Sequence, residues 1–209
     1  MVMRRTVLAL PVWAGLGTLL AASVARAEDL PAEAADFVAT LVQNAFAILK
    51  DKALSRDEKI KRLTDLYIED FDAPAMGIFA LGVYAGRVRG AQRAAYVDTF
   101  KNYVIQHYFS RLELVGDVFS MGSARPDGDG IAWVTSGIGS RGDKPYRVEW
   151  RVRKRDGALK IFDVILEGSS LLWIQRADFA SVLERNNGDV GKLIELMRMR
   201  KVGHDTPND

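Results

Sequence analysis

The spacing of the hydrophobic residues changes near Val118, and this change constrains the fold more than any other feature of the chain. Upstream, Tyr96, Phe100 and Tyr103 begin an apolar stripe that recurs at helical intervals. Downstream, residues 146–153 alternate between apolar side chains and arginine or glutamate. Helical spacing followed by strict alternation predicts helices and then antiparallel strands. The chain is therefore predicted to be an α+β domain in which helices cover one face of a sheet.

Turn and capping signals place the boundaries of the predicted elements. Ser55 and Glu58 form a capping box that begins a helix. Glycine-containing turns separate four strands, which are expected to form a curved, mainly antiparallel sheet like that of NTF2- and cystatin-type folds. The predicted helices are 37–52, 55–67, 74–84, 96–115, 177–185 and 190–197, and the predicted strands are 119–124, 131–138, 145–153 and 158–166.

The first residues have the pattern of an export signal. A basic start with Arg4 and Arg5 precedes an apolar run, and Ala25-Arg26-Ala27 fits a small-x-small cleavage site. Pro11 and two glycines interrupt the apolar run, which favours a cleaved signal over a membrane anchor. We predict a signal peptide at 1–27, exported by the Sec or the twin-arginine route, a single domain at 28–202 and a disordered tail at 203–209.

Charge and cysteine content exclude several functional classes. Removing residues 1–27 leaves 26 Lys and Arg against 27 Asp and Glu, a net charge of −1. Nucleic acid is therefore not an expected partner, because its binding depends on many cationic contacts with phosphates. The chain has no cysteine, which excludes disulfides, thiol catalysis and thiolate metal sites.

The motifs of common enzymes are absent or stand in the wrong context. Gly137-Ile-Gly139-Ser-Arg-Gly142 matches a dinucleotide-binding motif in letters, but it precedes a strand instead of opening a helix. The two histidines, His107 and His204, are too few for a metal site, and no metal or other cofactor is expected. One enzymatic alternative stays open: a small cavity enzyme in which Asp163 and His107 meet inside a pocket.

Large apolar side chains lie on elements that are expected to face one another. They can form an ordinary filled core, or they can line a pocket where the curved sheet holds the helices away from its concave face. The second interpretation predicts a lipid-binding pocket lined by Met76, Phe79, Phe100, Tyr103, Val104, Tyr108, Trp133, Tyr146, Val148, Trp150, Val152, Ile165, Leu171 and Trp173.

Asp163 is the single acid in the apolar strand at 161–166, which leads through Gly168 into a helix. A buried carboxylate requires hydrogen-bond donors or a cation. We predict that Asp163 ties the strand to the helix, either through backbone N–H groups at 168–171 or through an arginine, with Arg176 as the expected partner.

Three motifs, in order, resemble the MlaC family, also called the toluene-tolerance family. They are Phe71-Asp72 with Met76 and Leu81-Gly82, Arg93-x-x-Tyr96-x-x-x-Phe100 followed by Tyr108, and Asp163-Val with Glu167-Gly168-Ser169-Ser170-Leu171. The chain departs from the family pattern at Tyr96, where phenylalanine is usual, and at Ser169, where valine or isoleucine is usual.

The resemblance implies a periplasmic carrier that is not an enzyme. Such a carrier holds the acyl chains of a phospholipid and passes the lipid between complexes in the inner and outer membranes, in association with an ABC transporter that maintains outer-membrane lipid asymmetry. The related HpnM subgroup implies a hopanoid lipid instead. A structural subunit of an envelope complex, with a filled core, is the remaining alternative.

Overall fold

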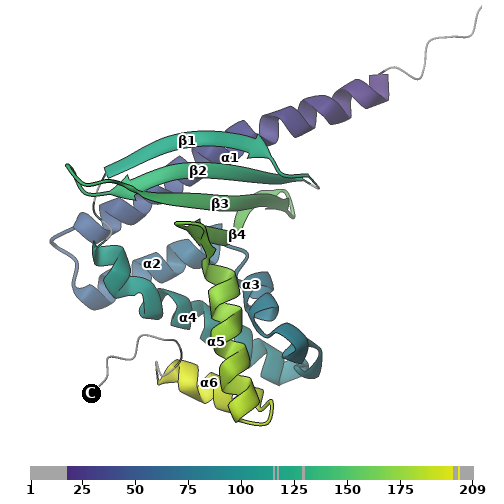
Figure 1. Ribbon diagram of the computed structural model, residues 1–209, viewed down its shortest axis with the longest axis vertical. Helices are drawn as coiled ribbons and strands as arrows, with labels where there is room; N and C mark the ends of the chain where they lie inside the picture. The colour runs from purple at the N-terminus through teal and green to yellow at the C-terminus, as the bar shows by residue number, and fades with distance from the viewer. Residues whose placement is uncertain (1–17, 115, 117, 129, 200–201, 203–209) are drawn as a thin grey trace, which may run out of the picture.

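The computed structural model describes residues 18–114, 116, 118–128, 130–199 and 202 (Figure 1). The expected tail at 203–209 and the first part of the expected signal peptide, 1–17, lie outside these residues. The elements in order are α1 (Thr18–Lys50), α2 (Arg56–Asp70), α3 (Ala73–Ala80), the 3-10 helix η1 (Gly82–Arg87), α4 (Gly90–Leu114), β1 (Val118–Pro126), β2 (Ile131–Gly139), β3 (Tyr146–Arg155), β4 (Ala158–Leu166), β5 (Ser169–Ser170), α5 (Leu171–Arg185) and α6 (Val190–Arg198).

The strands form one antiparallel sheet in the order β1-β2-β3-β4-β5. The four predicted strands are confirmed, but the prediction of a four-stranded sheet omitted β5, which has only two residues. Glu167 and Gly168 both have positive φ, 47° and 83°, and make the tight turn that folds β5 back on β4. Register shifts between β1 and β2 and between β3 and β4 bend the sheet.

α1 and α4 begin earlier than the expected residues 37 and 96, at Thr18 and Gly90, and the start of α5 and the end of α3 also differ from the sequence prediction. α5 begins at Leu171, six residues before the expected start at 177, because Ser170 caps it by accepting from the backbone N–H of Trp173 at 3.1 Å. α3 ends at Ala80, and a 3-10 helix follows where a continuous helix to residue 84 was expected. The capping box at the start of α2 is confirmed: Ser55 accepts from Glu58 N at 3.3 Å, and the Glu58 carboxylate accepts from Ser55 N at 2.8 Å.

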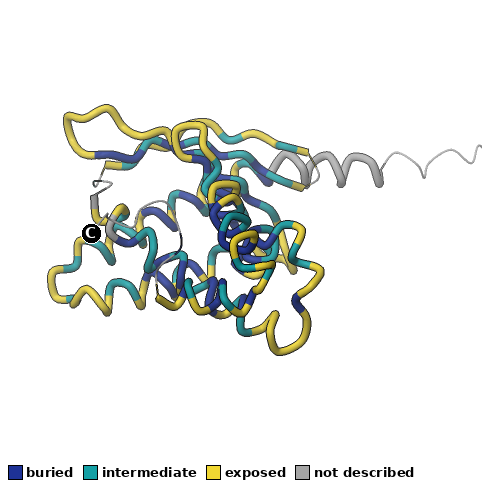
Figure 2. The backbone as a smooth tube through the Cα atoms, turned by 60° about the horizontal axis from the view of Figure 1, so that its bottom comes forward, coloured by how far each residue is buried: buried dark blue, intermediate teal, exposed yellow. Residues whose placement is uncertain are grey.

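The core consists of two hydrophobic clusters, one between α1 and the sheet and one among the helices. Figure 2 shows buried residues, in dark blue, in both the strands and the helices. The sheet cluster lies between α1, which packs mainly on β1 and β2, and the inner face of the sheet. Its buried residues are Leu30, Ala34, Val38, Leu41, Val42, Ala132, Val134, Ile138, Val148, Trp150, Val152 and Ile161. The helical cluster joins α2 to α6 and includes Leu63, Tyr67, Met76, Phe100, Tyr103, Phe109, Leu172, Phe179, Leu183, Leu193 and Met197. Helices thus cover one face of the sheet, as the sequence predicted.

Helix α1 is unusually apolar. Its segment Leu30–Lys50 is long and apolar enough to cross a membrane, judged by length and composition alone. Here Ala34, Val38 and Leu41 of this segment pack against the sheet. Some of the apolar residues of α1 are therefore explained by their burial against the sheet.

Asp72 joins the helical layer to the sheet. Its backbone N–H donates to the Ile161 carbonyl at 2.8 Å, and its carboxylate caps α3 by accepting from Ala75 N at 3.3 Å. The same carboxylate accepts hydrogen bonds from Arg153 and, at 2.7 Å, from Arg155, both on β3. Burial opposes ionisation of the carboxyl, but these hydrogen bonds outweigh burial and hold the pKa of Asp72 below its ordinary value of 3.8.

Asp163 ties β4 to α5, although not through the expected arginine. Its carboxylate accepts from the Ser170 hydroxyl at 2.8 and 2.9 Å and from the Leu172 backbone N–H at 3.4 Å. Arg176 points elsewhere, and its guanidinium lies 4.8 Å from the Phe79 ring centroid and 5.0 Å from that of Trp173. The prediction of Arg176 as partner is wrong because the start of α5 at residue 171 brings backbone N–H groups to the carboxylate first. Burial raises the pKa of Asp163, against the effect of the Ser170 hydrogen bond.

We expect Asp72→Asn to lower the free energy of unfolding by about 1–3 kcal/mol near neutral pH, because two guanidinium groups lose their carboxylate while asparagine still caps α3. Since the pKa of Asp72 is lowered in the folded state, its contribution is present above the pKa of the unfolded carboxyl and is lost as the pH falls through the folded pKa. Urea unfolding between about pH 7 and about pH 2 measures this loss.

The matched control is Asp65→Asn. Asp65 pairs with Lys61 at 3.0 Å, but the two side chains are 62% and 77% exposed. Solvent screening makes such a pair worth less than about 0.5 kcal/mol. Equal losses in the two variants would contradict the role given to Asp72.

Ser170→Ala should lower the free energy of unfolding by about 1–2 kcal/mol, because the hydroxyl both caps α5 and donates to the buried Asp163. The neighbouring Ser169→Ala, on the exposed side of β5, should have little effect. Thermal unfolding of both variants makes the comparison, and a Ser169→Ala protein as unstable as Ser170→Ala would argue against the junction described here.

Candidate functional site

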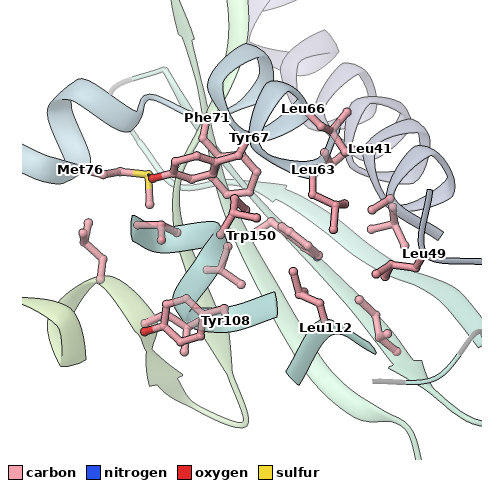
Figure 3. A pocket seen from close by; sticks show the side chains of 18 of the residues that line it. Leu41, Leu49, Leu63, Leu66, Tyr67, Phe71, Met76, Tyr108, Leu112 and Trp150 are labelled. Atoms are coloured by element: carbon pink, nitrogen blue, oxygen red, sulfur yellow. The ribbon is translucent and has the colours of Figure 1, made fainter. Parts of the chain in front are cut away.

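An apolar cavity lies where the two hydrophobic clusters fail to meet. α1 and the sheet form one wall, α2 and the segment after it form a second, and α4 and α5 form the third (Figure 3). The lining residues are Leu41, Val42, Ala45, Phe46, Leu49, Leu63, Leu66, Tyr67, Phe71, Met76, Phe100, Val104, Ile105, Tyr108, Leu112, Ile138, Trp150, Val164, Leu171, Leu172 and Gln175.

The size of the cavity matches a hydrocarbon chain. On α4 the lining extends from Phe100 to Leu112, about 18 Å of helix. The cavity volume is about 220 Å³. The length and the apolar lining suit the hydrocarbon chain of a lipid.

Polar atoms at the cavity wall are mostly bound within the protein. The Trp150 indole Nε1 donates to Ser136 Oγ at 2.9 Å, so the ring itself faces the cavity as an apolar surface. The Tyr67 hydroxyl lies 3.9 Å from Met76 Sδ. Figure 3 shows these two side chains pointing toward each other. Burial raises the pKa of Tyr67 above its ordinary value, so this hydroxyl stays neutral.

One end of the cavity adjoins a polar depression. Phe46, Leu49 and Leu112 line both spaces, and the depression adds Lys50 and Glu113 at the ends of α1 and α4. The Lys50 ammonium lies 5.5 Å from the Phe46 ring centroid. An amphiphile can therefore place its apolar body in the cavity and its polar end at this rim.

The structure brings together six of the residues predicted to line a pocket. Met76, Phe100, Val104, Tyr108, Trp150 and Leu171 line the cavity. Five others are inside the fold but are not among the residues that line the cavity. These are Tyr103, whose hydroxyl donates to the Val202 carbonyl at 2.9 Å, together with Val148, Val152, Ile165 and the partly buried Phe79.

The placement of Trp133, Tyr146 and Trp173 in the pocket was wrong. The register pairs Trp133 with Arg151 and the next residue, Val134, with Trp150. Trp133 therefore lies on the outer face, where the Arg125 and Arg151 guanidinium groups are 5.1 and 5.5 Å from its ring centroid. Tyr146, at the start of β3, is 53% exposed. Trp173 is 57% exposed and packs edge-on against Phe79.

Sequence reasoning missed the contribution of α1 and α2. Leu41 and Ala45 on α1, and Leu63, Leu66 and Tyr67 on α2, belong to the apolar stripes that predicted these helices. Their spacing was a sufficient signal for a buried face. The spacing does not say whether that face meets another side chain or an open space, because this depends on how the helices cross.

His107 and Asp163 do not meet in the cavity, since neither is among its lining residues. His107 stacks on Tyr103 with ring centroids 5.1 Å apart and meets Tyr108 edge-on at 4.8 Å. Burial, with a further effect of Arg111, lowers the pKa of His107 and favours the neutral imidazole. Among the described residues there is no group of three or more acidic, histidine or cysteine side chains placed to hold a metal ion.

A structure of known function has a similar fold. The phospholipid-binding protein from Ralstonia solanacearum, solved in complex with a phospholipid, superposes with a TM-score of 0.68 at 23% sequence identity, over 79% of this chain and 95% of that chain. At this level of identity the likeness concerns the fold.

The family follows from the sequence itself. Residues 39–199 match the family model described as MlaC protein. This match covers most of the chain and includes α2 to α5 and the cavity residues on them. The resemblance seen in the motifs is thereby confirmed, and the chain belongs to the MlaC family.

Proposed function

We propose that the protein is a periplasmic lipid carrier. It encloses the acyl chains of a phospholipid in the apolar cavity and leaves the headgroup at the polar rim beside Lys50 and Glu113. The observation that carries this proposal is the cavity itself, which is lined by hydrocarbon and aromatic side chains over about 18 Å of α4. Membership of the MlaC family and the phospholipid held by the similar Ralstonia protein support it.

The energetics of lipid transfer explain why such a cavity is useful. Exposing a lipid of roughly 30 methylenes to water costs on the order of 20 kcal/mol, at about 0.8 kcal/mol per methylene. Free diffusion between membranes is therefore negligible, and a carrier has only to replace the bilayer as an apolar environment. No bond is made or broken in this process, so the carrier role needs no catalytic group or cofactor.

The cavity runs along α4 as a single space between the two layers, whereas a phospholipid has two acyl chains. Binding both chains requires the helical layer and the sheet to separate further along the gap between the two clusters. Asp72 and Asp163 hold the layers together at one edge, so the separation would open the opposite end, near Leu49 and Leu112.

The periplasmic location rests on the predicted signal peptide and on the family. Cleavage after Ala27 would remove the first part of α1 and leave Leu41 to Leu49, which line the cavity. The mature carrier would then exchange lipid with membrane-bound transport complexes of the inner and outer membranes.

The alternatives differ in what they require of the cavity. A hopanoid of the HpnM type would use the same apolar lining and would be distinguished by the identity of the bound lipid. The structural-subunit alternative requires a filled core, which the cavity argues against. The enzymatic alternative requires Asp163 and His107 to meet in the cavity, and no observation favours it.

We expect the protein, purified from the periplasm under native conditions, to contain lipid. Extraction with organic solvent and mass spectrometry would identify diacyl phospholipid under the main proposal and hopanoid under the alternative. Repeated absence of any stoichiometric lipid would count against both.

Trp150→Glu should abolish lipid retention, because it places an unpaired carboxylate on the cavity wall. The matched control is Trp133→Glu, which makes the same substitution on the outer face of the same sheet, beside Arg125 and Arg151. The control should retain lipid at the wild-type level. Circular dichroism would verify that both variants are folded, and equal retention in both would show that the cavity is not the lipid site.

Ala45→Trp tests the cavity without adding charge. The larger side chain fills space between α1 and α4, so the lipid content should fall by about half or more while the helices remain intact. Ala94→Trp, at an exposed position on α4, is the control and should leave the lipid content unchanged. Lipid content is measured per mole of protein after extraction.

A further inference from the structure

Gln175 is the one amide among the residues that line the cavity, and its amide has no hydrogen-bond partner among the described residues. The residue lies in the second turn of α5 and is only 3% exposed. Both its Nε2 donor and its Oε1 acceptor are buried and unpaired. A buried amide in this state is unfavourable, since it has lost water without gaining another partner.

Two other polar groups near the cavity are bound inside the protein. Trp150 Nε1 donates to Ser136, and the Tyr103 hydroxyl donates to the Val202 carbonyl at 2.9 Å. Burial raises the pKa of the Tyr103 hydroxyl, and the neighbouring Gln175 side chain opposes this rise as a potential hydrogen-bond partner. The amide nevertheless lies outside hydrogen-bond geometry with that hydroxyl, which donates to the Val202 carbonyl instead. Gln175 therefore has unused hydrogen-bonding capacity in an otherwise apolar site.

Gln175 lies well below the polar rim. Its side chain neighbours Tyr103 on α4. Leu112, the α4 residue that lines both the cavity and the polar depression, is about 13 Å further along the same helix. A charged headgroup at the rim does not reach this depth. The group that meets Gln175 belongs to the part of the ligand inside the cavity.

We propose that Gln175 is a specificity-determining residue, and that its amide hydrogen-bonds an uncharged oxygen of the lipid within the cavity. Nε2 can donate to an ester carbonyl, and the two amide atoms together can pair with a hydroxyl. The inference rests on the proposed carrier function. It adds selection for oxygen-bearing lipids, because a site built to hydrogen-bond a ligand oxygen disfavours an analogue that lacks it.

The test measures displacement of a fluorescent fatty acid from the delipidated protein by two matched pairs of ligands. One pair is a diester phosphatidylcholine and the diether phosphatidylcholine with the same chain lengths, which lacks the carbonyls. The other is 12-hydroxystearate and stearate. We expect the wild type to prefer the oxygen-bearing member of at least one pair by about 3- to 10-fold, and the pair concerned identifies the oxygen as carbonyl or hydroxyl.

Gln175→Leu should remove that preference while leaving the affinity for the diether lipid or stearate unchanged. A wild type without preference in either pair would overturn the inference, as would a Gln175→Leu protein that keeps the preference. If no ligand of either pair displaces the probe, the carrier function itself fails. Displacement without preference leaves the carrier function in place and removes only the role of Gln175.

A purely structural role for Gln175 gives different results. If the amide serves to hold Tyr103 or a buried water, Gln175→Leu lowers the melting temperature of the lipid-free protein and weakens all four ligands equally, and this outcome overturns the inference. If the amide is reserved for the ligand, lipid-free Gln175→Leu melts at the same temperature as wild type or up to about 2–4 °C higher. Tyr103→Phe removes the hydroxyl that neighbours the Gln175 amide. This variant should keep the wild-type ligand preference.

Discussion

The carboxylate of Asp72 is the contact on which the arrangement of the two layers depends. It caps α3 on the helical side and accepts hydrogen bonds from Arg153 and Arg155 on the sheet side, while its own backbone N–H binds β4. Asp163 makes a second connection, between β4 and α5. Together these buried acids fix where the helical layer meets the sheet. Both are structural ties, and their hydrogen-bonding capacity is used within the fold.

The cavity is a consequence of where the layers are held. α1 lies mainly on β1 and β2 and forms the sheet cluster with the inner face of the sheet, whereas α2 to α6 pack around Phe100 and Phe179 and form the helical cluster. Side chains of both clusters face the space between them, and most have only hydrocarbon or aromatic surface to offer. A filled core would have merged the clusters. Keeping them apart gives up packing energy in the empty protein, and an apolar ligand restores it.

Much of the fold was predictable because local patterns determine local structure. The Ser55–Glu58 capping box and the alternation along β3 each depend on residues close together in sequence. The residues of the site were less predictable. Trp133 was placed on the wrong face because its size suggested burial. Successive residues of a strand point to opposite faces, and since Val134 faces inward with Trp150, Trp133 faces outward with Arg151. Arg176 was chosen as a partner by charge, whereas Ser170 is closer to Asp163 in the folded chain.

The sequence by itself determined the α+β class, the order of the elements, the four long strands and the family, since these follow from hydrophobic periodicity, capping and ordered motifs. Only the tertiary structure decided that the stripes of α1 and α2 face an open space, and that Gln175 lies unpaired beside it. The physical reason is that periodicity specifies which side of a helix is apolar. Whether that side meets a neighbour or a cavity depends on contacts such as Asp72 with Arg155, which join residues far apart in the chain.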